Sequence, residues 1–456
     1  MRPIRVAVVG GGPAGIYAAD ILTREYEGAS VDVIERLPAP YGLVRYGVAP
    51  DHPRIKEIIK ALRRVLDNDR IRFFGNVDFG NDLKLDDLKR FYDAVIFSTG
   101  AMADRDLNVP GEDLDGSFGA ADFVSWYAGH PDVPRDWPLT AKSVAVLGAG
   151  NVGLDVARML AKPADEQLVT EIADNVYQGL KANQATEVHV FARRGPAHIK
   201  FSPMELRELS HSPSVDVIVE EEGFQIDDAG QAEISGAKSV KLVVDTLLKY
   251  LEATPTGAPH KIVIHMMQNP VEILGEDGKV VAIRTERTEY DGTGNVHGTG
   301  EFIDTPVQAV YRAIGYLSSP LADVPFDDRK GVIPNAGGRV LTESAEHGGT
   351  QIPGIYVTGW IKRGPVGLIG HTKSDAKETV DHLLADLDSI PVPEVADPAG
   401  IVEHLTARGI EFTTEEGWGK LEEHERALGA AASTDELTRE RVKVVPREEM
   451  IQISRA

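Results

Sequence analysis

The sequence predicts an α/β protein with two Rossmann-like dinucleotide-binding domains. Two segments, VAVVGGGPAGIYAADIL and VAVLGAGNVGLDVARML, each combine an apolar strand, a G-x-G-x-x-G turn and an amphipathic helix. The chain has 456 residues, more than one ordinary core accommodates, so we expect two domains. The internal repeat and the length together favour a nucleotide-binding fold that is used twice.

Composition narrows the class of protein. Hydrophobic residues make up 42% of the chain, and its 45 glycines and 27 prolines are spread along it, so we expect a globular protein throughout. The formal net charge of −23 argues against binding of nucleic acid or anionic membranes through bulk electrostatics. The absence of cysteine excludes disulfides, thiolate nucleophiles and cysteine-ligated iron–sulfur clusters.

The start of the chain and its hydropathy predict a cytoplasmic location. The sequence enters a strand almost at once, in IRVAVVG, which leaves no room for a signal peptide. No apolar run reaches the roughly 18 residues that a membrane-spanning helix needs. We therefore expect a cytoplasmic protein without a membrane span.

The first glycine turn and the start of its helix comprise Gly10, Gly12, Pro13, Ala14 and Gly15. The glycines allow a tight turn, the approach of a pyrophosphate to bare backbone and close packing of helix on strand, while the helix N-terminus supplies N–H donors. Glu35 ends the next strand, in SVDVIERLP, where a carboxylate can accept hydrogen bonds from ribose hydroxyls. This pattern favours FAD or NAD, and a structural turn without a ligand is the alternative.

The second glycine turn and the start of its helix comprise Gly148, Gly150, Asn151, Val152 and Gly153. Here the next strand, EVHVFARRG, ends in Arg193 and Arg194 instead of an acid, which suits a ribose that bears a 2′-phosphate. The simplest ligand with such a phosphate is NADP. The spacing requires a long connection before the strand, and the alternative is an arginine pair that is solvated or bound to carboxylates.

A chain with one site for FAD or NAD and another for NADP most economically holds a resident flavin and a visiting NADPH. Two further apolar strands, in YDAVIFSTGAM and VYRAIGYLSS, end in a glycine, at Gly100 and Gly315, as expected where the chain crosses between two nucleotide domains. The segment GIYVTGWIKRGPVGLIGHTKSDAKETVDHLL predicts a strand, a glycine-rich loop and a helix. The N-terminus of that helix could stabilise negative charge on a reduced flavin.

With these motifs the chain resembles the adrenodoxin reductase family of FAD-dependent NADPH-ferredoxin reductases. The matching pieces are GGGPAGIYAA, PYGLVRYGVAPDHPRIK, RFFGNV, NVPGEDL, GAGNVGLDVAR, RRGP, ELREL and GWIKRGPVGLIG. The resemblance implies an NADP domain inserted into a discontinuous FAD domain, and electron transfer from NADPH through FAD to a small iron–sulfur protein. We expect the FAD domain over 1–106 and 332–456 and the NADP domain over 107–331.

The resemblance also implies roles for single residues. Glu35 matches the ribose-binding acid, and Arg193 and Arg194 match the pair that contacts the 2′-phosphate. The residues expected around the flavin are Leu43, Gly100, Gly359, Trp360, Gly367, Leu368 and Ile369. His52 and Glu205 fall at positions that the family uses near its active site, where they could orient nicotinamide or take up a proton. Alternatively, His52 organises a turn, Glu205 is an exposed helical carboxylate and Trp360 packs in the core.

A partner of this kind is usually acidic, so docking on this acidic chain needs a local cationic face. The sequence RIKEIIKALRRVL predicts a helix with an apolar side and with Lys56, Lys60 and Arg63 on another side. Further cations of the NADP domain that could join this face are Arg207, Lys241 and Lys249. A solvated charged stripe without a partner is the alternative.

Three competing functions follow from the same plan. A dithiol flavoprotein is excluded because it needs a redox-active cysteine pair. An NADPH diaphorase or quinone reductase would use the same flavin chemistry without a protein partner. A sensing module would bind FAD and NADPH without turnover.

The sequence after about residue 391 predicts acidic helices that Trp418 anchors to the body, and we assign this region no chemistry.

Overall fold

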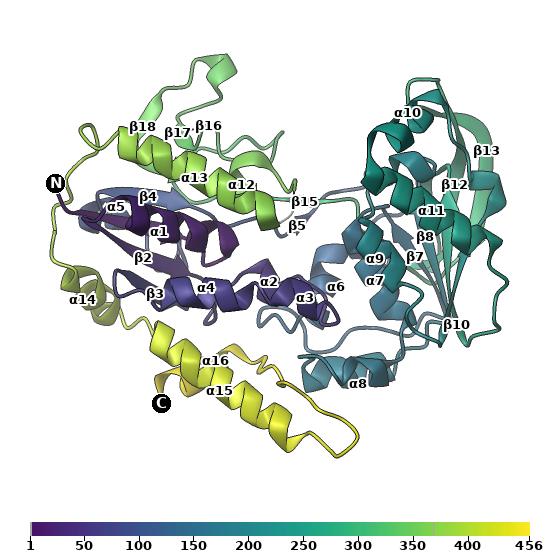
Figure 1. The fold of residues 1–456 in the computed structure, drawn as a ribbon, viewed down its shortest axis with the longest axis horizontal. Helices are drawn as coiled ribbons and strands as arrows, with labels where there is room; N and C mark the ends of the chain where they lie inside the picture. The colour runs from purple at the N-terminus through teal and green to yellow at the C-terminus, as the bar shows by residue number, and fades with distance from the viewer. Residues whose placement is uncertain (1, 368) are drawn as a thin grey trace. The chain divides into compact units, whose positions relative to one another are not determined.

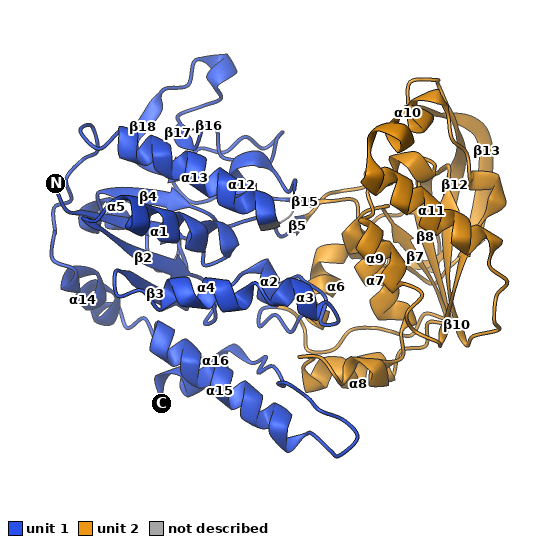
Figure 2. Cartoon of the chain, in the orientation of Figure 1, with its two compact units in different colours: residues 1–103, 128–132, 316–456 blue, residues 104–127, 133–315 orange. Residues whose placement is uncertain are grey.

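The computed structural model describes residues 2–367 and 369–456 and divides the chain into two compact units (Figure 2). Unit 1 comprises residues 1–103, 128–132 and 316–456, and unit 2 comprises residues 104–127 and 133–315. Unit 2 is thus an insertion in a discontinuous unit 1, and the predicted fold class is confirmed. The units change at 103/104 and 315/316, whereas the predicted domain boundaries are 106/107 and 331/332. The short strands β5 (Ala103–Asp104) and β15 (Tyr316–Leu317) lie at these changes.

Unit 1 is built on a seven-stranded sheet with the order β16-β17-β18-β4-β1-β2-β3 (Figure 1). Its strands are β1 (Ile4–Val9), β2 (Ala29–Glu35), β3 (Ile71–Gly75), β4 (Ala94–Phe97), β16 (Asn335–Ala336), β17 (Arg339–Leu341) and β18 (Gln351–Val357). The five strands from β18 to β3 are parallel, and β16 and β17 extend them as an antiparallel edge. The carboxyl ends of β1, β2, β4 and β18 therefore meet at one edge of the sheet, where ligands of such folds bind.

Both faces of this sheet are buried. Alternating residues of β1 separate two hydrophobic cores, with Val6 and Val8 in one and Ala7 and Val9 in the other. The helices of unit 1 are α1 (Pro13–Glu25), α2 (Leu43–Tyr46), α3 (Pro53–Lys56), α4 (Ile59–Leu66), α5 (Leu85–Phe91), α12 (Trp360–Arg363), α13 (Ile369–Ala385), α14 (Ala399–Ala407), α15 (Glu415–Ala431) and α16 (Arg447–Arg455), with a 3₁₀ turn η4 (Ala345–His347). Helices α1 and α13 pack side by side on one face (Figure 1).

Unit 2 is built on a six-stranded parallel sheet with the order β6-β14-β7-β8-β10-β9. Its strands are β6 (Ser117–Gly119), β7 (Ser143–Leu147), β8 (Glu187–Ala192), β9 (Val215–Val219), β10 (His260–Met266) and β14 (Ala309–Arg312). An antiparallel sheet of β11 (Gln268–Glu276), β12 (Lys279–Tyr290) and β13 (Val296–Pro306) covers one face. The core between the two sheets includes Leu147, Phe191, Ile283 and Val310.

The helices of unit 2 are α6 (Ala120–Tyr127), α7 (Asn151–Ala161), α8 (Asp174–Lys181), α9 (Pro203–Glu208), α10 (Asp228–Gly236) and α11 (Lys238–Glu252), with 3₁₀ turns η1 (Ala164–Gln167), η2 (Pro196–His198) and η3 (Glu221–Gly223). Turn η1 and helix α8 lie between α7 and β8. They are the long connection that the spacing between the second glycine turn and the arginine pair requires.

The region after residue 391 is helical, as predicted, and the Trp418 side chain that anchors it is only 1% exposed. In contrast, the prediction of a single basic helix over residues 54–66 is wrong. The segment forms two short helices, α3 and α4, separated at residues 57 and 58. Within the described part of the chain, every helix is too short or too polar to cross a membrane.

Candidate functional site

The first glycine turn, in unit 1, leads from β1 directly into α1. Gly10 has φ +112°, and a Cβ there would lie 2.5 Å from the Ser98 carbonyl oxygen. A Cβ on Gly15 would lie 2.2 Å from the Gly10 carbonyl oxygen. Substitution at either position would therefore displace backbone, because these glycines pack strand and helix together.

Gly12 differs from its two neighbours because the space beside it is open. The nearest atom to a Cβ on Gly12 is the Gly42 Cα at 3.9 Å. Gly12 is the N-cap of α1 and Pro13 and Ala14 form the first helical positions, so the N-cap residue offers no side chain to bond the first N–H groups of the helix. Bare backbone with free donors in front of a helix N-terminus fits a pyrophosphate.

Glu35 is the last residue of β2, and its carboxylate lies beside the first glycine turn. Its Oε2 accepts a hydrogen bond from Gly11 N at 2.6 Å, and its Oε1 accepts one from Leu37 N at 3.0 Å. Burial raises the pKa of this carboxyl, while the two backbone hydrogen bonds oppose the rise. Each oxygen keeps a further lone pair, so Glu35 could accept hydrogen bonds from ribose hydroxyls.

The turn before α2 completes this edge of unit 1. Tyr41 N donates to the Gly11 carbonyl at 2.8 Å, which brings Leu43, the first residue of α2, next to the glycine turn. Gly100 follows β4 with φ +77°, and no atom lies within 4 Å of a Cβ built there. Both predicted residues therefore lie along the carboxyl edge of the sheet.

The segment after β18 carries the residues expected around a flavin. Gly359 has φ +77°, and a Cβ there would lie 2.7 Å from the Ala14 Cβ, so this turn packs against the first turn of α1. Trp360 is half-buried, which argues against a purely structural place in the core. Gly367 has φ +87°. Of the remaining predicted residues, Leu368 lies outside the described residues and Ile369 begins α13.

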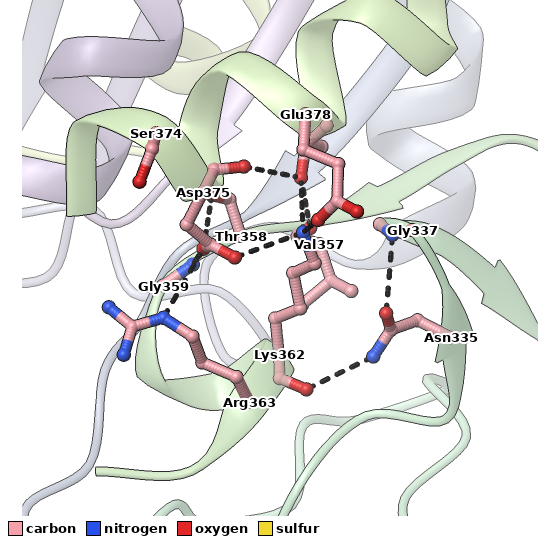
Figure 3. A network of polar contacts seen from close by, with 12 residues as sticks. Asn335, Gly337, Val357, Thr358, Gly359, Lys362, Arg363, Ser374, Asp375 and Glu378 are labelled. Atoms are coloured by element: carbon pink, nitrogen blue, oxygen red, sulfur yellow. Dashed lines mark hydrogen bonds and ion pairs between the residues drawn. The ribbon is translucent and has the colours of Figure 1, made fainter. Parts of the chain in front are cut away.

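Sequence reasoning missed a polar network directly behind this segment (Figure 3). Asp375, on α13, accepts hydrogen bonds from Gly359 N and from Thr358, and it forms an ion pair with the buried Lys362. The spacing of these residues along α12 and α13 gives no signal of its own, because the contacts depend on how the two helices pack.

The second glycine turn, in unit 2, repeats the geometry of the first. Gly148 has φ +125°, and a Cβ there would lie 2.2 Å from the Ala313 carbonyl oxygen, whereas a Cβ on Gly153 would lie 2.4 Å from the Gly148 carbonyl oxygen. No atom lies within 4 Å of a Cβ on Gly150, the N-cap of α7. This turn therefore also presents open backbone at a helix N-terminus, which fits a second pyrophosphate.

Asn151 and Val152 form the first turn of α7, and both are half-buried. The Asn151 Oδ1 accepts a hydrogen bond from Ser202 N at 2.8 Å. Ser202 is the N-cap of α9, so this contact links the second glycine turn to the helix that carries Glu205.

Arg193 and Arg194 follow β8 directly, next to the strand that ends in the second glycine turn. Arg193 is exposed and Arg194 half-exposed. Across the described residues, neither guanidinium has an ion-pair partner, although carboxylates pair with many other arginines of this chain. Two unpaired guanidinium groups at this position fit a phosphate on a ribose.

The two titratable residues expected near the reaction lie in different units. His52 is the N-cap of α3 in unit 1 and is 4% exposed. Glu205 lies in the first turn of α9 in unit 2 and is 5% exposed. The alternative that Glu205 is an exposed helical carboxylate is therefore wrong.

The predicted docking cations differ in their availability. Lys56 is 9% exposed, so its predicted place on a charged exposed side is wrong; the break between α3 and α4 turns it inward. Arg63 forms ion pairs with Glu415 at 2.6 Å and Glu422 at 3.3 Å, both on α15. Lys60 is exposed and pairs with Glu57 at 2.5 Å.

Comparison with known proteins identifies the family. The protein family described as pyridine nucleotide-disulphide oxidoreductase matches residues 4–195. The NADPH-ferredoxin reductase FprA of Mycobacterium tuberculosis is 40% identical, over 99% of this chain and 99% of its own. The mitochondrial NADPH:adrenodoxin oxidoreductase of Arabidopsis thaliana is 37% identical, over 99% of this chain and 95% of its own. The chain belongs to the family of adrenodoxin reductases and FprA-type NADPH-ferredoxin reductases.

A solved member of this family has the same fold. The structure of Mycobacterium tuberculosis FprA in complex with NADPH matches with a TM-score of 0.88 at 37% identity and covers all of both chains. The resemblance noted in the sequence is therefore confirmed over the full length. Two open glycine turns, one with an acid at the next strand end and one with an arginine pair there, fit the binding of two different dinucleotides by a member of this family.

Proposed function

We propose that this chain is a flavoprotein oxidoreductase that takes electrons from NADPH through FAD to a ferredoxin-type iron–sulfur protein. The observation that carries the proposal is the contrast between two equivalent strand ends. Glu35 ends β2 beside the first glycine turn, and the unpaired Arg193 and Arg194 follow β8 beside the second. An acid selects a free 2′-hydroxyl and a guanidinium pair selects a 2′-phosphate, so unit 1 takes FAD and unit 2 takes NADP(H).

Two sets of residues would hold the cofactors. Those for FAD are Gly10, Gly12, Pro13, Ala14, Gly15, Glu35, Leu43, Gly100, Gly359, Trp360, Gly367, Leu368 and Ile369. Those for NADP(H) are Gly148, Gly150, Asn151, Val152, Gly153, Arg193 and Arg194, with Glu205 toward the nicotinamide. The names of the relatives, NADPH-ferredoxin reductase and NADPH:adrenodoxin oxidoreductase, support NADPH as donor and an iron–sulfur protein as acceptor.

FAD, when bound, accepts a hydride from NADPH and gives up single electrons. The task of the chain is to bind both dinucleotides, exclude water and hold charge. The N–H groups at the start of α1 and α7 bind the two pyrophosphates, and Arg193 with Arg194 discriminates NADPH from NADH. Trp360 shapes the ring pocket, and Gly367 leaves the backbone bare where the nicotinamide approaches.

His52 and Glu205 are the titratable side chains that we propose to orient the nicotinamide or to hold the proton that accompanies one-electron transfer. Both are buried, which suits groups that act away from bulk water. The variant E205Q should slow flavin reduction by NADPH or raise the KM for NADPH. An unchanged rate with an unchanged KM would contradict this role.

Anaerobic stopped-flow reduction tests the two-cofactor assignment. NADPH should bleach the flavin absorbance of the purified protein rapidly, and NADH should do so only at much higher concentration. Flavin that NADPH fails to bleach would favour the sensing module over the oxidoreductase.

We propose that the partner docks through exposed cations of unit 2. Arg207 on α9 and Lys249 on α11 are exposed and have no ion-pair partner among the described residues, whereas Lys241 pairs with Asp245 at 2.7 Å. Tyr250 ties the two helices together, because its hydroxyl donates to the Leu206 carbonyl at 2.8 Å. Exposed apolar side chains that accompany these cations are Met204, Leu242 and Leu248.

A charged docking face makes electron transfer to the partner sensitive to salt. The variants R207Q and K249Q should each raise the KM for an acidic [2Fe–2S] ferredoxin and leave flavin reduction by NADPH unchanged. The matched control is K60Q, since Lys60 already pairs with Glu57. Ferredoxin reduction that does not depend on ionic strength would contradict electrostatic docking.

The cytoplasmic location expected from the sequence stays a prediction.

A further inference from the structure

The side chain of Asp375 binds the end of β18 from the neighbouring helix α13 (Figure 3). Its Oδ2 accepts a hydrogen bond from Gly359 N at 2.6 Å and another from Thr358 Oγ1 at 3.0 Å. The Asp375 side chain is 9% exposed. A carboxylate buried to this degree is tolerated only when its oxygens are bonded, so these contacts fix both the carboxylate and the backbone that it binds.

The second oxygen of Asp375 binds a buried ammonium group. Oδ1 lies 3.0 Å from Lys362 Nζ, and the Lys362 side chain is 6% exposed. The same ammonium contacts Glu378 at 2.6 Å and Thr379 Oγ1 at 3.2 Å. Asp375 therefore joins three pieces of chain: the end of β18, helix α12, which carries Lys362, and helix α13.

The turn at Gly359 needs such support because of its own conformation. Gly359 has φ +77° and ψ −151°, a region that favours glycine. Its carbonyl accepts hydrogen bonds from Lys362 N and Arg363 N in α12, whereas its N–H is bonded by a side chain. On its other side the turn abuts Ala14, in the first turn of α1. Among the described residues, Asp375 is the one side chain that bonds the Gly359 N–H. The placement of Trp360, the next residue, thus depends on Asp375.

We propose that Asp375 is a positioning residue for the flavin, which it serves by holding the Gly359–Trp360 turn in place. The inference rests on the proposed function, because it takes this turn as the border of the ring pocket. Asp375 itself is not proposed to border the pocket. It acts through the backbone of Gly359 and through Lys362, so its loss should disturb the ring environment without removing any group that contacts the cofactor.

The variant D375N tests this role. The amide keeps the size of the side chain but loses the charge and one acceptor oxygen, which weakens hydrogen bonds that are otherwise charge-assisted. Purified D375N should show a shifted visible absorption and circular dichroism spectrum of bound FAD. The Kd for FAD, measured by fluorescence on the apoprotein, should rise about tenfold, and the rate of flavin reduction by NADPH should fall about tenfold. The KM for NADPH should stay unchanged, because unit 2 is not altered.

The matched control is E378Q, on the same helix. Glu378 also pairs with Lys362 but contacts neither Gly359 nor Thr358. This variant should keep the wild-type flavin spectrum, Kd for FAD and reduction rate. An E378Q protein that changes as much as D375N would overturn the proposal, since the effect would then come from the charge balance around Lys362.

A milder variant covers the case in which D375N does not fold. Thr358 is fully buried, and T358V removes one hydrogen bond to Asp375 while it keeps the shape of the side chain. It should shift the flavin spectrum in the same direction by a smaller amount. Wild-type spectra and Kd values in both T358V and any folded D375N would overturn the proposal. If wild-type protein reduces its FAD with NADPH but ignores ferredoxin, the partner assignment fails while these flavin readouts still decide the role of Asp375.

Discussion

Arg45 and Glu425, 380 residues apart in the sequence, form a buried two-point ion pair. Arg45 Nη1 lies 3.1 Å from Glu425 Oε2, and Nη2 lies 2.5 Å from Oε1. The two side chains are 3% and 0% exposed. The Trp418 ring lies 5.0 Å from the Arg45 guanidinium carbon, and Lys443 Nζ donates to the Arg45 carbonyl at 2.7 Å. Helix α15 and Lys443, in the segment after it, therefore hold α2 in place beside the first glycine turn.

Loss of the Glu425 charge should destabilise unit 1. The variant E425Q leaves the Arg45 guanidinium buried without its carboxylate, and breaking a buried pair in this way costs about 3–5 kcal/mol. Thermal denaturation followed by release of fluorescent FAD should show a clearly lower midpoint. The matched control is E423Q, an exposed glutamate on the same helix, which should leave the midpoint unchanged. Equal midpoints for E425Q and wild-type protein would contradict the structural role of the pair.

The open space beside Gly150 predicts a variant that folds but binds NADPH poorly. Because no atom lies within 4 Å of a Cβ at this position, Gly150→Ala should keep the thermal stability of the wild type. The added methyl group should occupy the approach of the pyrophosphate and raise the Kd for NADPH about tenfold or more. Titration calorimetry with NADP⁺, which carries the same pyrophosphate as NADPH, should show the same rise in Kd.

The control is Gly153→Ala, whose Cβ would lie 2.4 Å from the Gly148 carbonyl oxygen. It should lower the thermal stability, because backbone must move. If Gly150→Ala binds NADP⁺ as the wild type does, the second glycine turn is not the pyrophosphate site.

Replacement of either unpaired arginine should weaken the binding of NADPH but not that of NADH. Hydrogen bonds to charged groups are worth about 1.5–3 kcal/mol, so R193Q or R194Q should raise the KM for NADPH about tenfold or more. The KM for NADH should not change, because NADH has no 2′-phosphate. Steady-state reduction of ferricyanide with each nucleotide measures both values, and R207Q serves as the control in the same unit. A parallel loss with both nucleotides would assign the arginines a structural role instead.

A histidine on β8 predicts an acid-sensitive unit 2. His189 Nδ1 lies 2.9 Å from His265 Nε2, and His265 Nδ1 lies 2.7 Å from Glu220 Oε2. Burial and the neighbouring His265 lower the pKa of His189 to about 4, from an ordinary value of 6.5. The folded chain therefore keeps His189 neutral where the unfolded chain binds a proton. The stability that this supplies is complete above pH 6.5 and is lost as the pH falls toward 4.

Replacement of His189 should flatten this dependence. Between pH 7 and pH 5 the thermal midpoint of H189Q should fall less than that of the wild type. The difference corresponds to the one proton that His189 binds when the wild-type chain unfolds. The control is H297Q, because His297 is largely exposed and pairs with the exposed Glu289. A fall in H189Q as steep as in the wild type would show that other groups control the acid sensitivity.

The sequence predicted those parts of the site that depend on neighbours along the chain. The glycine turns, Glu35 and the arginine pair all follow from local strand–turn–helix order. Lys56 was misplaced because a helical pattern cannot reveal the break at residues 57 and 58, which changes the face that the lysine occupies.

Asp375 and Glu425 were missed for a different reason. Their partners lie on other elements, and only the packing of α13 against β18 and of α15 against α2 brings them together. A lone aspartate or glutamate on an amphipathic helix gives no signal that it is buried. The structure also showed that α15 neutralises Arg63, which the helical pattern alone assigned to a docking face.

The most direct test of electron transfer to a ferredoxin is NADPH-driven reduction of cytochrome c by the purified, flavin-loaded protein, with and without an added [2Fe–2S] ferredoxin from the same source. We expect a large stimulation that saturates with ferredoxin concentration, because electrons leave the flavin through that partner. Cytochrome c reduction that ferredoxin does not change would contradict it and would favour an NADPH diaphorase.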